Sequence, residues 1–318
     1  MVESSDDTPS TISADDWVAT VVRDGQALGF DSDFLRRRAA SFVRQQLERR
    51  VDLEFAERFA RHCPVPGARS TDYLHRVLEF GSDAALVGIR FRGGDLSFPF
   101  VDLLACTSPW RTVHEAVVSD AFAVFAPKAL RVFEARVSAI EEGEVVDQWF
   151  HAATIDEVAH AEVDGQNEAM RIEPVVSREL DACFDSLRRW YREFATSEPE
   201  LADRVQPASR EQLEACMADG ALRWIVVRDE RVGLLGFARA CEWYFDGLVV
   251  MEEIVARDHT GHAYAAHAQC LLAEELVPRE SGTLLWGTID AHNRASIRTA
   301  QRAGRPARAA WLFRPLGR

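Results

Sequence analysis

Apolar positions along this 318-residue chain follow two different spacings, which predict two kinds of secondary structure. Apolar residues that recur every three or four positions among charged ones predict helices over residues 33–63, 112–125, 178–194, 209–218, 262–277 and 293–303. Shorter apolar or alternating runs, many of them bounded by Gly, Asp or Pro, predict strands over residues 84–91, 96–106, 129–137, 146–153, 170–176, 222–227, 232–242, 247–255, 284–289 and 309–313. The mixture indicates an α/β protein.

The order of the predicted elements is similar in the two halves of the chain: helices, a hairpin, a strand, a helix and a strand. A chain of 318 residues is also long for one domain, since domains of roughly 100–200 residues are the most common. We therefore predict one domain over residues 15–165 and a second, similar one over residues 166–318. Residues 1–14 are polar and acidic, and we expect them to form a disordered tail.

The charge balance argues against a broad nucleic-acid surface. The chain has 51 acidic and 37 basic residues, a net charge of −14, whereas nucleic-acid binding needs clustered Lys and Arg. The six cysteines are scattered and no His/Cys/Asp set has zinc spacing, so we expect no metal. No segment approaches the roughly 18 apolar residues of a membrane span, and no apolar run lies near the N-terminus, so we expect a cytoplasmic protein without a secretory signal.

The most informative segment covers residues 249–265, VVMEEIVARDHTGHAYA. A strand there leads into a loop with Gly261 and the small residues Ala263 and Ala265, and the loop leads into a helix. The N–H groups of such a loop and the positive end of the helix dipole point at the same place. The pattern therefore predicts an anion-binding site.

This segment resembles the cofactor loop of the GCN5-related N-acetyltransferase (GNAT) superfamily, usually written Q/R-x-x-G-x-G/A. Asp258 takes the Q/R position, Gly261 the first Gly, and Ala263 the last position. Further along, Asn293 opens a second helix that ends at a Gly-Arg pair, which matches the family's second conserved block.

The resemblance covers about residues 170–316 and implies the GNAT fold there. Since the element order is similar in the two halves, we expect the first half to be a degenerate copy of the same fold. Each would be a mixed, mostly antiparallel sheet flanked by helices, and the two together would be a tandem GNAT protein. In the second half, acyl-CoA would lie in a splay between the strands at 247–255 and 284–289.

The resemblance also implies a co-substrate, acetyl-CoA or another acyl-CoA. Its pantetheine arm would pair with the strand backbone and its pyrophosphate would lie in the loop. The residues so assigned are Ile254, Val255, Arg257, His259, Thr260, Gly261, His262, Ala263 and Asn293. The Asn293 side chain equally fits a simple helix N-cap, and loop histidines equally fit an exposed surface.

Acyl transfer to an amine needs a base and a polarised thioester carbonyl. Glu252 and Glu253 lie on the strand beside the expected acyl site, and since adjacent strand residues face opposite sides, at most one faces the acceptor. Either also fits a structural ion pair. For the acceptor we expect contacts from Tyr244, Asp290 and His292, which fit aromatic packing and turn chemistry equally well.

The chain departs from the family pattern in three places. The loop has Asp258 and Thr260 where a basic residue is usual, and Ala300 stands where the family often has a general-acid Tyr. In the first half, residues 107–111 (TSPWR) contain no glycine and a bulky Trp, so the backbone there is unable to wrap a pyrophosphate. We therefore expect the first domain to lack a cofactor loop.

Three functions follow from these observations. The first is an N-acyltransferase that uses acyl-CoA and a small-molecule amine, and the acidic chain favours a cationic acceptor such as an amino sugar or polyamine. The second is a transferase of the same fold with a carrier-protein or aminoacyl-tRNA donor, which the base-poor loop favours. The third is a non-catalytic binding module, which the missing Tyr favours. We expect a monomer or homodimer that binds neither nucleic acid nor membrane.

Overall fold

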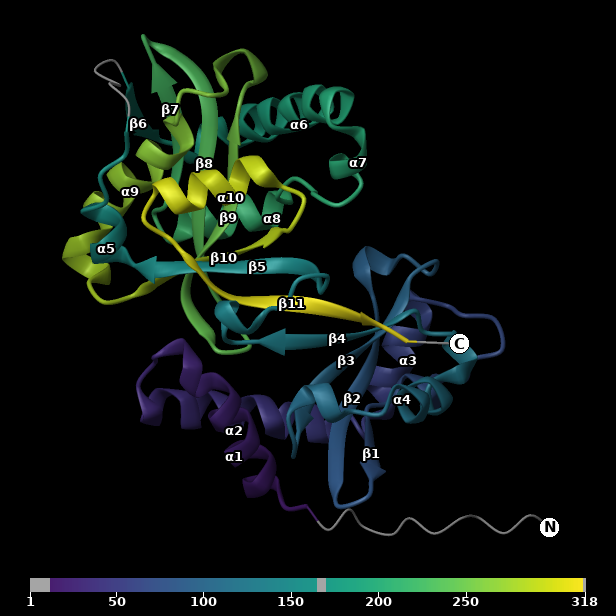
Figure 1. Cartoon of the computed structure of the whole chain (residues 1–318). Helices are drawn as coiled ribbons and strands as arrows, with labels where there is room; N and C mark the ends of the chain where they lie inside the picture. Colours follow the sequence, from purple (N-terminus) through teal and green to yellow (C-terminus); the bar gives the residue numbers. More distant parts are fainter. Residues whose placement is uncertain (1–11, 165–169, 317–318) are drawn as a thin grey trace. The chain divides into compact units, whose positions relative to one another are not determined.

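The computed structural model describes residues 12–164 and 170–316, which form two compact units (Figure 1). Among these residues, unit 1 holds those up to Val146 and those from Trp311 onward, and unit 2 runs from Asp147 to Ala310. Each unit combines a mixed sheet with helices, which confirms the predicted α/β class.

Unit 1 has a mostly antiparallel sheet with three α-helices before it in sequence and a fourth between β3 and β4. Its helices are α1 (Ala14–Gly25), α2 (Ser32–Glu48), α3 (Leu53–His62) and α4 (Glu115–Ala121). Its strands are β1 (Arg76–Phe80), β2 (Asp83–Phe91), β3 (Pro99–Cys106), β4 (Ala129–Glu134) and the second half of β11 (Ala307–Pro315), in the order β1-β2-β3-β4-β11. Only β3 and β4 are parallel among the pairs whose register is known in this unit.

Unit 2 has the same kind of sheet and more helices. Its helices are α5 (Ile155–Ala159), α6 (Leu180–Ser197), α7 (Pro199–Ala202), α8 (Arg210–Ala218), α9 (Tyr264–Glu280) and α10 (Arg294–Arg302). Its strands are β5 (Val145–Thr154, almost all of it in this unit), β6 (Met170–Pro174), β7 (Leu222–Val227), β8 (Glu230–Glu242), β9 (Phe245–Val255), β10 (Leu284–Asp290) and the start of β11, in the order β6-β7-β8-β9-β10-β5-β11. The pairing of β9 with β10 is parallel, and the other registered pairs are antiparallel.

The sheet of unit 2 is buried on both faces, and alternation along β7 explains why. Trp224 and Val226 belong to the apolar cluster under α6 and α8. Ile225 and Val227 point the other way, into the cluster under α5 and α9. Because strand side chains alternate, one short apolar run anchors helices on both faces and holds α9 and α6 on opposite sides of β9.

The parallel strands of each unit separate after three paired residues. In unit 2 the pairing of β9 with β10 ends at Val249 and Trp286, although both strands continue. In unit 1 the pairing of β3 with β4 ends at Asp102 and Arg131. The unit 2 opening is the predicted splay.

Each unit also has an irregularity two residues beyond the last parallel pair. The register of β8 with β9 skips Met251, and that of β2 with β3 skips Leu104. A β-bulge of this kind turns consecutive side chains to one face, and Met251 and Glu252 both face α6 and α8. Glu253 therefore faces α9.

Two strands lie in a different unit from their sequence neighbours. β5 follows the strands of unit 1 in sequence, but it pairs with β10 in unit 2. β11 follows unit 2, but from Trp311 onward it lies in unit 1, where Leu316 N–H donates to Lys128 O at 3.0 Å. The compact units thus divide between Val146 and Asp147, whereas the sequence places the domain boundary at 165/166.

Several local predictions need correction. Residues 1–11 of the expected tail lie outside the described residues, but Ser13 and Asp16 form a capping box that starts α1, a helix that the sequence analysis missed. It also missed β1, a short strand with a mixed burial pattern. No helix in the described ranges is both long and apolar enough to cross a bilayer.

Candidate active site

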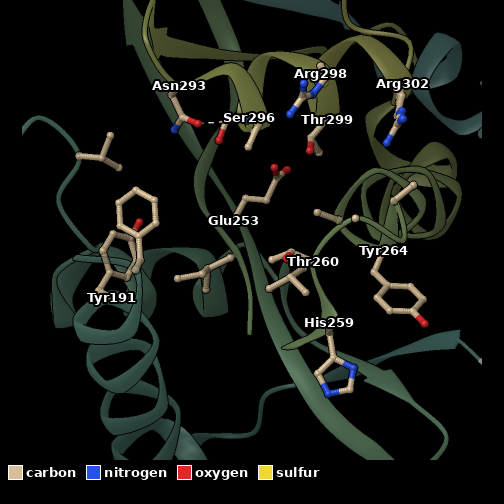
Figure 2. Close-up of a pocket in the computed structure, with 18 residues that line it drawn as sticks. Tyr191, Glu253, His259, Thr260, Tyr264, Asn293, Ser296, Arg298, Thr299 and Arg302 are labelled. Carbon is tan, nitrogen blue, oxygen red and sulfur yellow. Dashed lines mark hydrogen bonds between the residues drawn. The ribbon is translucent and has the colours of Figure 1, made fainter. Parts of the chain in front are cut away.

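The opening between β9 and β10 belongs to a cleft in unit 2 with about 1000 Å³ of space, counting its open mouth (Figure 2). Its walls come from α6, the segment after α7, the end of β9, the loop before α9, the first residues of α9 and one face of α10 along its length. The lining residues are Tyr191, Phe194, Val205, Glu253, Ile254, Val255, His259, Thr260, Gly261, Ala263, Tyr264, Ala265, Asn293, Ala295, Ser296, Arg298, Thr299 and Arg302. In Figure 2, Glu253 lies at the centre, below the side chains of α10.

The loop before α9 has the shape of an anion site. Gly261 has a φ of +88°, and a Cβ there would have no atom within 4 Å, so a ligand can approach its backbone. Ala263, the N-cap of α9, has a φ of +59°, which costs an alanine about 1–2 kcal/mol. Because alanine has no side-chain oxygen, it leaves the first N–H groups of α9 uncapped, and the helix dipole adds positive potential there.

Two arginines of α10 bring positive charge to the same cleft. Arg298 and Arg302 are one helical turn apart, so they share a face, and both point into the cleft in Figure 2. Both are exposed, and neither makes an ion pair with any residue in the ranges 12–164 and 170–316. They supply the cations that the loop itself lacks.

A buried polar chain supports Glu253. The Gln269 side chain donates to the Glu253 carboxylate, and its Oε1 accepts a hydrogen bond from Arg305 Nε at 2.9 Å. Arg305 is only 2% exposed. Burial raises the pKa of Glu253, while the Arg305 charge and the Gln269 hydrogen bond act in the opposite direction. The cleft therefore has a carboxyl group at its centre that is connected through Gln269 to a buried arginine.

Glu252 lies on the other face of β9 and is 3% exposed. Its Oε1 accepts hydrogen bonds from the Tyr191 hydroxyl at 3.1 Å and from its neighbour's N–H at 2.9 Å, and its Oε2 accepts from Ala208 N–H at 2.8 Å. Burial raises the pKa of Glu252 to about 7. Tyr191 lines the cleft and Glu252 does not, so the phenol connects this carboxyl group to the cleft.

The fold brings most of the residues assigned to the cofactor to the cleft. Those that line it are Ile254, Val255, His259, Thr260, Gly261, Ala263 and Asn293. Asn293 also caps α10, because its Oδ1 accepts from Ser296 N–H at 3.1 Å. Arg257 and His262 are exposed residues outside the lining, and the His262 ring stacks on Tyr264 with centroids 5.3 Å apart. The binding roles of all these residues stay predictions.

The residues expected to contact the acceptor lie elsewhere. Tyr244 is 2% exposed in the turn that begins β9, whereas the cleft lies at the other end of that strand. Asp290, 5% exposed, accepts hydrogen bonds from the backbone N–H and Nδ1 of His292 at 2.9 and 3.0 Å, and Arg204 lies 3.7 Å away. Tyr244 is thus packed, and Asp290 and His292 form a turn, so none of the three lines the cleft.

Ten of the eighteen lining residues were not predicted from the sequence, and three of them, Tyr191, Arg298 and Arg302, have polar side chains that bear on function. Arg298 and Arg302 had a readable signal, because they share one face of the helix predicted to open at the cofactor site. Tyr191 had none, since its position beside Glu252 depends on how α6 packs on β9.

The equivalent opening of unit 1 lacks the carboxylates. Counted from the last parallel pair and the bulge, Ala105 and Cys106 stand where unit 2 has Glu252 and Glu253. Arg23 of α1 donates to the backbone carbonyls of Cys106 and Thr107 at 3.2 and 3.1 Å.

Side chains of the loop after β3 fix it to neighbouring segments by hydrogen bonds and ion pairs. Trp110 Nε1 donates to Glu134 at 3.2 Å, and Arg111 pairs with Glu134 at 3.3 Å and Glu144 at 3.0 Å. Unit 1 therefore has neither a small-residue loop nor a carboxylate pair at this place, as the TSPWR segment indicated.

The described residues show no cluster of metal ligands, and burial keeps two cysteines of unit 2 protonated. No group of three or more His, Cys, Asp or Glu side chains in the described part of the chain is arranged to hold a metal ion. Burial raises the pKa of Cys183 and of Cys216 to about 12, so both are thiols rather than thiolates at neutral pH.

Comparisons with known proteins agree on the fold. A GCN5-related N-acetyltransferase from Sphaerobacter thermophilus superposes with a TM-score of 0.51 and 12% identity, over 97% of this chain and 95% of that one. A tandem GNAT protein from the clavulanic acid biosynthesis pathway has a TM-score of 0.42 and 13% identity, over 84% and 97% of the two chains. No family model and no curated protein matches the sequence. The chain thus has the GNAT fold, as the loop and helix motifs implied.

Proposed function

We propose that unit 2 is an N-acyltransferase that moves an acetyl or other acyl group from acyl-CoA to an amine. One observation carries the proposal: an anion loop, two exposed arginines and a buried carboxyl–phenol pair meet at one cleft. The GNAT fold supports the same assignment, because this cleft occupies the splay where the family binds acyl-CoA.

The phosphates of CoA match one end of the cleft. The backbone at Gly261 and Ala263 offers N–H donors and room, and Arg298 and Arg302 offer charge-assisted hydrogen bonds. Next to this end, the edge of β9 that has left β10 offers backbone groups to the amides of pantetheine.

The carboxyl–phenol pair provides a route for a proton. The Tyr191 hydroxyl accepts a proton from the incoming ammonium as it passes its own to Glu252, whose pKa of about 7 suits a base near neutral pH. The amine nitrogen then attacks the thioester carbon, so that a C–N bond forms and the C–S bond breaks. The second N–H proton goes to the departing sulfur, and Glu252 returns its proton to solvent. Because the amine itself supplies the proton for the sulfur, this route needs no acid at Ala300, a fully buried position.

The two alternative functions, a different acyl donor and a non-catalytic role, have less support than the acyl-CoA reaction. A carrier protein or aminoacyl-tRNA was favoured by the base-poor loop, but α10 supplies the missing cations from outside that loop. A non-catalytic role was favoured by Ala300, but Tyr191 and Glu252 supply a proton route. Neither alternative gains an observation of its own.

Thermal unfolding with CoA and acetyl-CoA tests the proposal. A ligand at about 100 times its Kd stabilises the native state by about 2.7 kcal/mol, so the apparent Tm should rise with concentration. Gly261→Asp should abolish the rise, because it places a negative charge where the phosphates bind. Gly282→Asp is the matched control. Gly282 has a similar φ of +76°, an added Cβ there would also have no atom within 4 Å, and the residue lies outside the cleft.

Arg298→Ala and Arg302→Ala should each weaken CoA binding about tenfold, and more so at low salt. Absence of any Tm rise in the natural protein would refute the acyl-CoA assignment. Equal effects of Gly261→Asp and Gly282→Asp would move the binding site away from this cleft.

A further inference from the structure

The two ends of the unit 2 cleft differ in chemistry. At one end lie the anion loop and the arginines of α10. At the other end lie Tyr191 and Phe194 of α6, Glu253 lies at the centre, and Val205 also lines the cleft (Figure 2 labels Tyr191 and Glu253). If the first end binds the acyl donor, the second is where the acceptor amine meets it.

The wall of the α6 end is apolar. The Tyr191 and Phe194 rings lie edge to face with centroids 6.1 Å apart, and Val205 adds an aliphatic surface. The Tyr191 hydroxyl is already used by Glu252, and the Oδ1 of Asn293 is used by the cap of α10. A sugar has more hydroxyls than this apolar wall can hydrogen-bond, and each hydroxyl buried without a partner costs roughly 1–3 kcal/mol.

The α6 end has one carboxyl group. Among the described residues that line the cleft, only Glu253 has a carboxyl side chain, and it interacts electrostatically with Tyr191 of the apolar wall. One ammonium group therefore finds a partner there. A second ammonium on the same molecule would be directed toward Arg298 and Arg302, which repel it.

We propose that the acceptor is a primary monoamine with an apolar body the size of an aromatic ring. This inference rests on the proposed function. The ammonium faces Glu253 and Tyr191, and the body packs on Phe194 and Val205. It replaces the amino sugar or polyamine that overall charge alone favoured. The reaction forms the C–N bond and releases CoA as the thiol, as above.

Thiol release from acetyl-CoA tests this with three amines: 2-phenylethylamine, glucosamine and spermidine. We expect kcat/KM for 2-phenylethylamine to exceed the other two at least about tenfold, the size of discrimination that apolar pockets give. Phe194→Ala should lower the ratio of kcat/KM for 2-phenylethylamine over ethylamine about tenfold. Phe184→Ala, a half-buried ring on the same helix but outside the cleft, should leave that ratio unchanged.

A measurement of CoA binding distinguishes failure of this inference from failure of the proposed function. A preference for glucosamine or spermidine would overturn this inference while leaving an acyl-CoA transferase. CoA binding without turnover of any of the three amines would also overturn it. Loss of CoA binding in the natural protein would instead refute the proposed function. If Phe194→Ala does not fold, as judged by loss of CoA-induced stabilisation, Phe194→Leu gives the same comparison with a smaller change in volume.

Discussion

The carboxyl group of Glu252 should make the stability of unit 2 depend on pH in a direction opposite to most acidic residues. Burial raises its pKa from 4.5 to about 7, so between these pH values the native state holds a proton that the unfolded chain has lost. Stability therefore falls as pH rises through this window. Each pH unit is worth about 1.4 kcal/mol, so the total loss is about 3 kcal/mol above pH 7.

Glu252→Gln isolates this effect. The amide does not ionise, but it presents a donor to the N–H of Ala208 or Glu253, which costs about 1–3 kcal/mol at every pH. The variant should therefore be less stable than the natural protein at pH 5, and the gap should close by about 3 kcal/mol at pH 8. Urea unfolding followed by tryptophan fluorescence at pH 5, 6, 7 and 8 measures the difference.

Only the change of this difference with pH bears on the argument, because the hydrogen-bond cost cancels. Glu200→Gln, at an exposed position of α7, is the matched control. A difference between Glu252→Gln and the natural protein that stays constant from pH 5 to pH 8 would refute the reasoning. The buried carboxyl would then be ionised throughout and unsuitable as a base near neutral pH.

Two further predictions concern β9 and its neighbours. Gly247→Ala should destabilise the protein by about 3 kcal/mol or more, because the new Cβ would lie 2.3 Å from Leu284 O and the backbone has a φ of +153°. The urea midpoint measures this loss of stability. A loss below about 1 kcal/mol would contradict this packing. Tyr191→Phe removes a hydrogen bond that lowers the pKa of Glu252, so the acidic limb of the pH–rate profile, where the base loses its proton, should move to higher pH while CoA binding stays constant. An unmoved pH–rate profile with full activity would exclude the phenol from the proton route.

The strand, loop and helix that carry the site were predictable because their signals are local. The run from Val249 to Ala265 needs only its own period, its glycine and its small residues to indicate a strand that ends at an anion site. The splay followed from the family resemblance. The sites of catalysis and acceptor binding were less accessible, because they depend on contacts between segments far apart in sequence.

The bulge at Met251 illustrates that limit. Alternation indicated that Glu252 and Glu253 face opposite sides, but the bulge decides which of them faces α6. Nothing in the residues VVMEEIV marks the place where the register slips. Tyr244 illustrates the opposite error, a local signal that misleads. Its aromatic neighbours suggested a pocket wall, but Tyr244 precedes the start of β9, whereas the cleft lies at the end of that strand.

The placement of β5 and β11 has a consequence for synthesis. The unit 1 sheet includes residues from Trp311 onward, so a ribosome must make all of unit 2 before that sheet has its last strand. β5, made early, waits for β10 before it can pair. Pairings across such long stretches of sequence slow folding. A nascent chain thus holds two unfinished sheets at once, and a single cleavage between Val146 and Asp147 would separate most of unit 1 from its last strand.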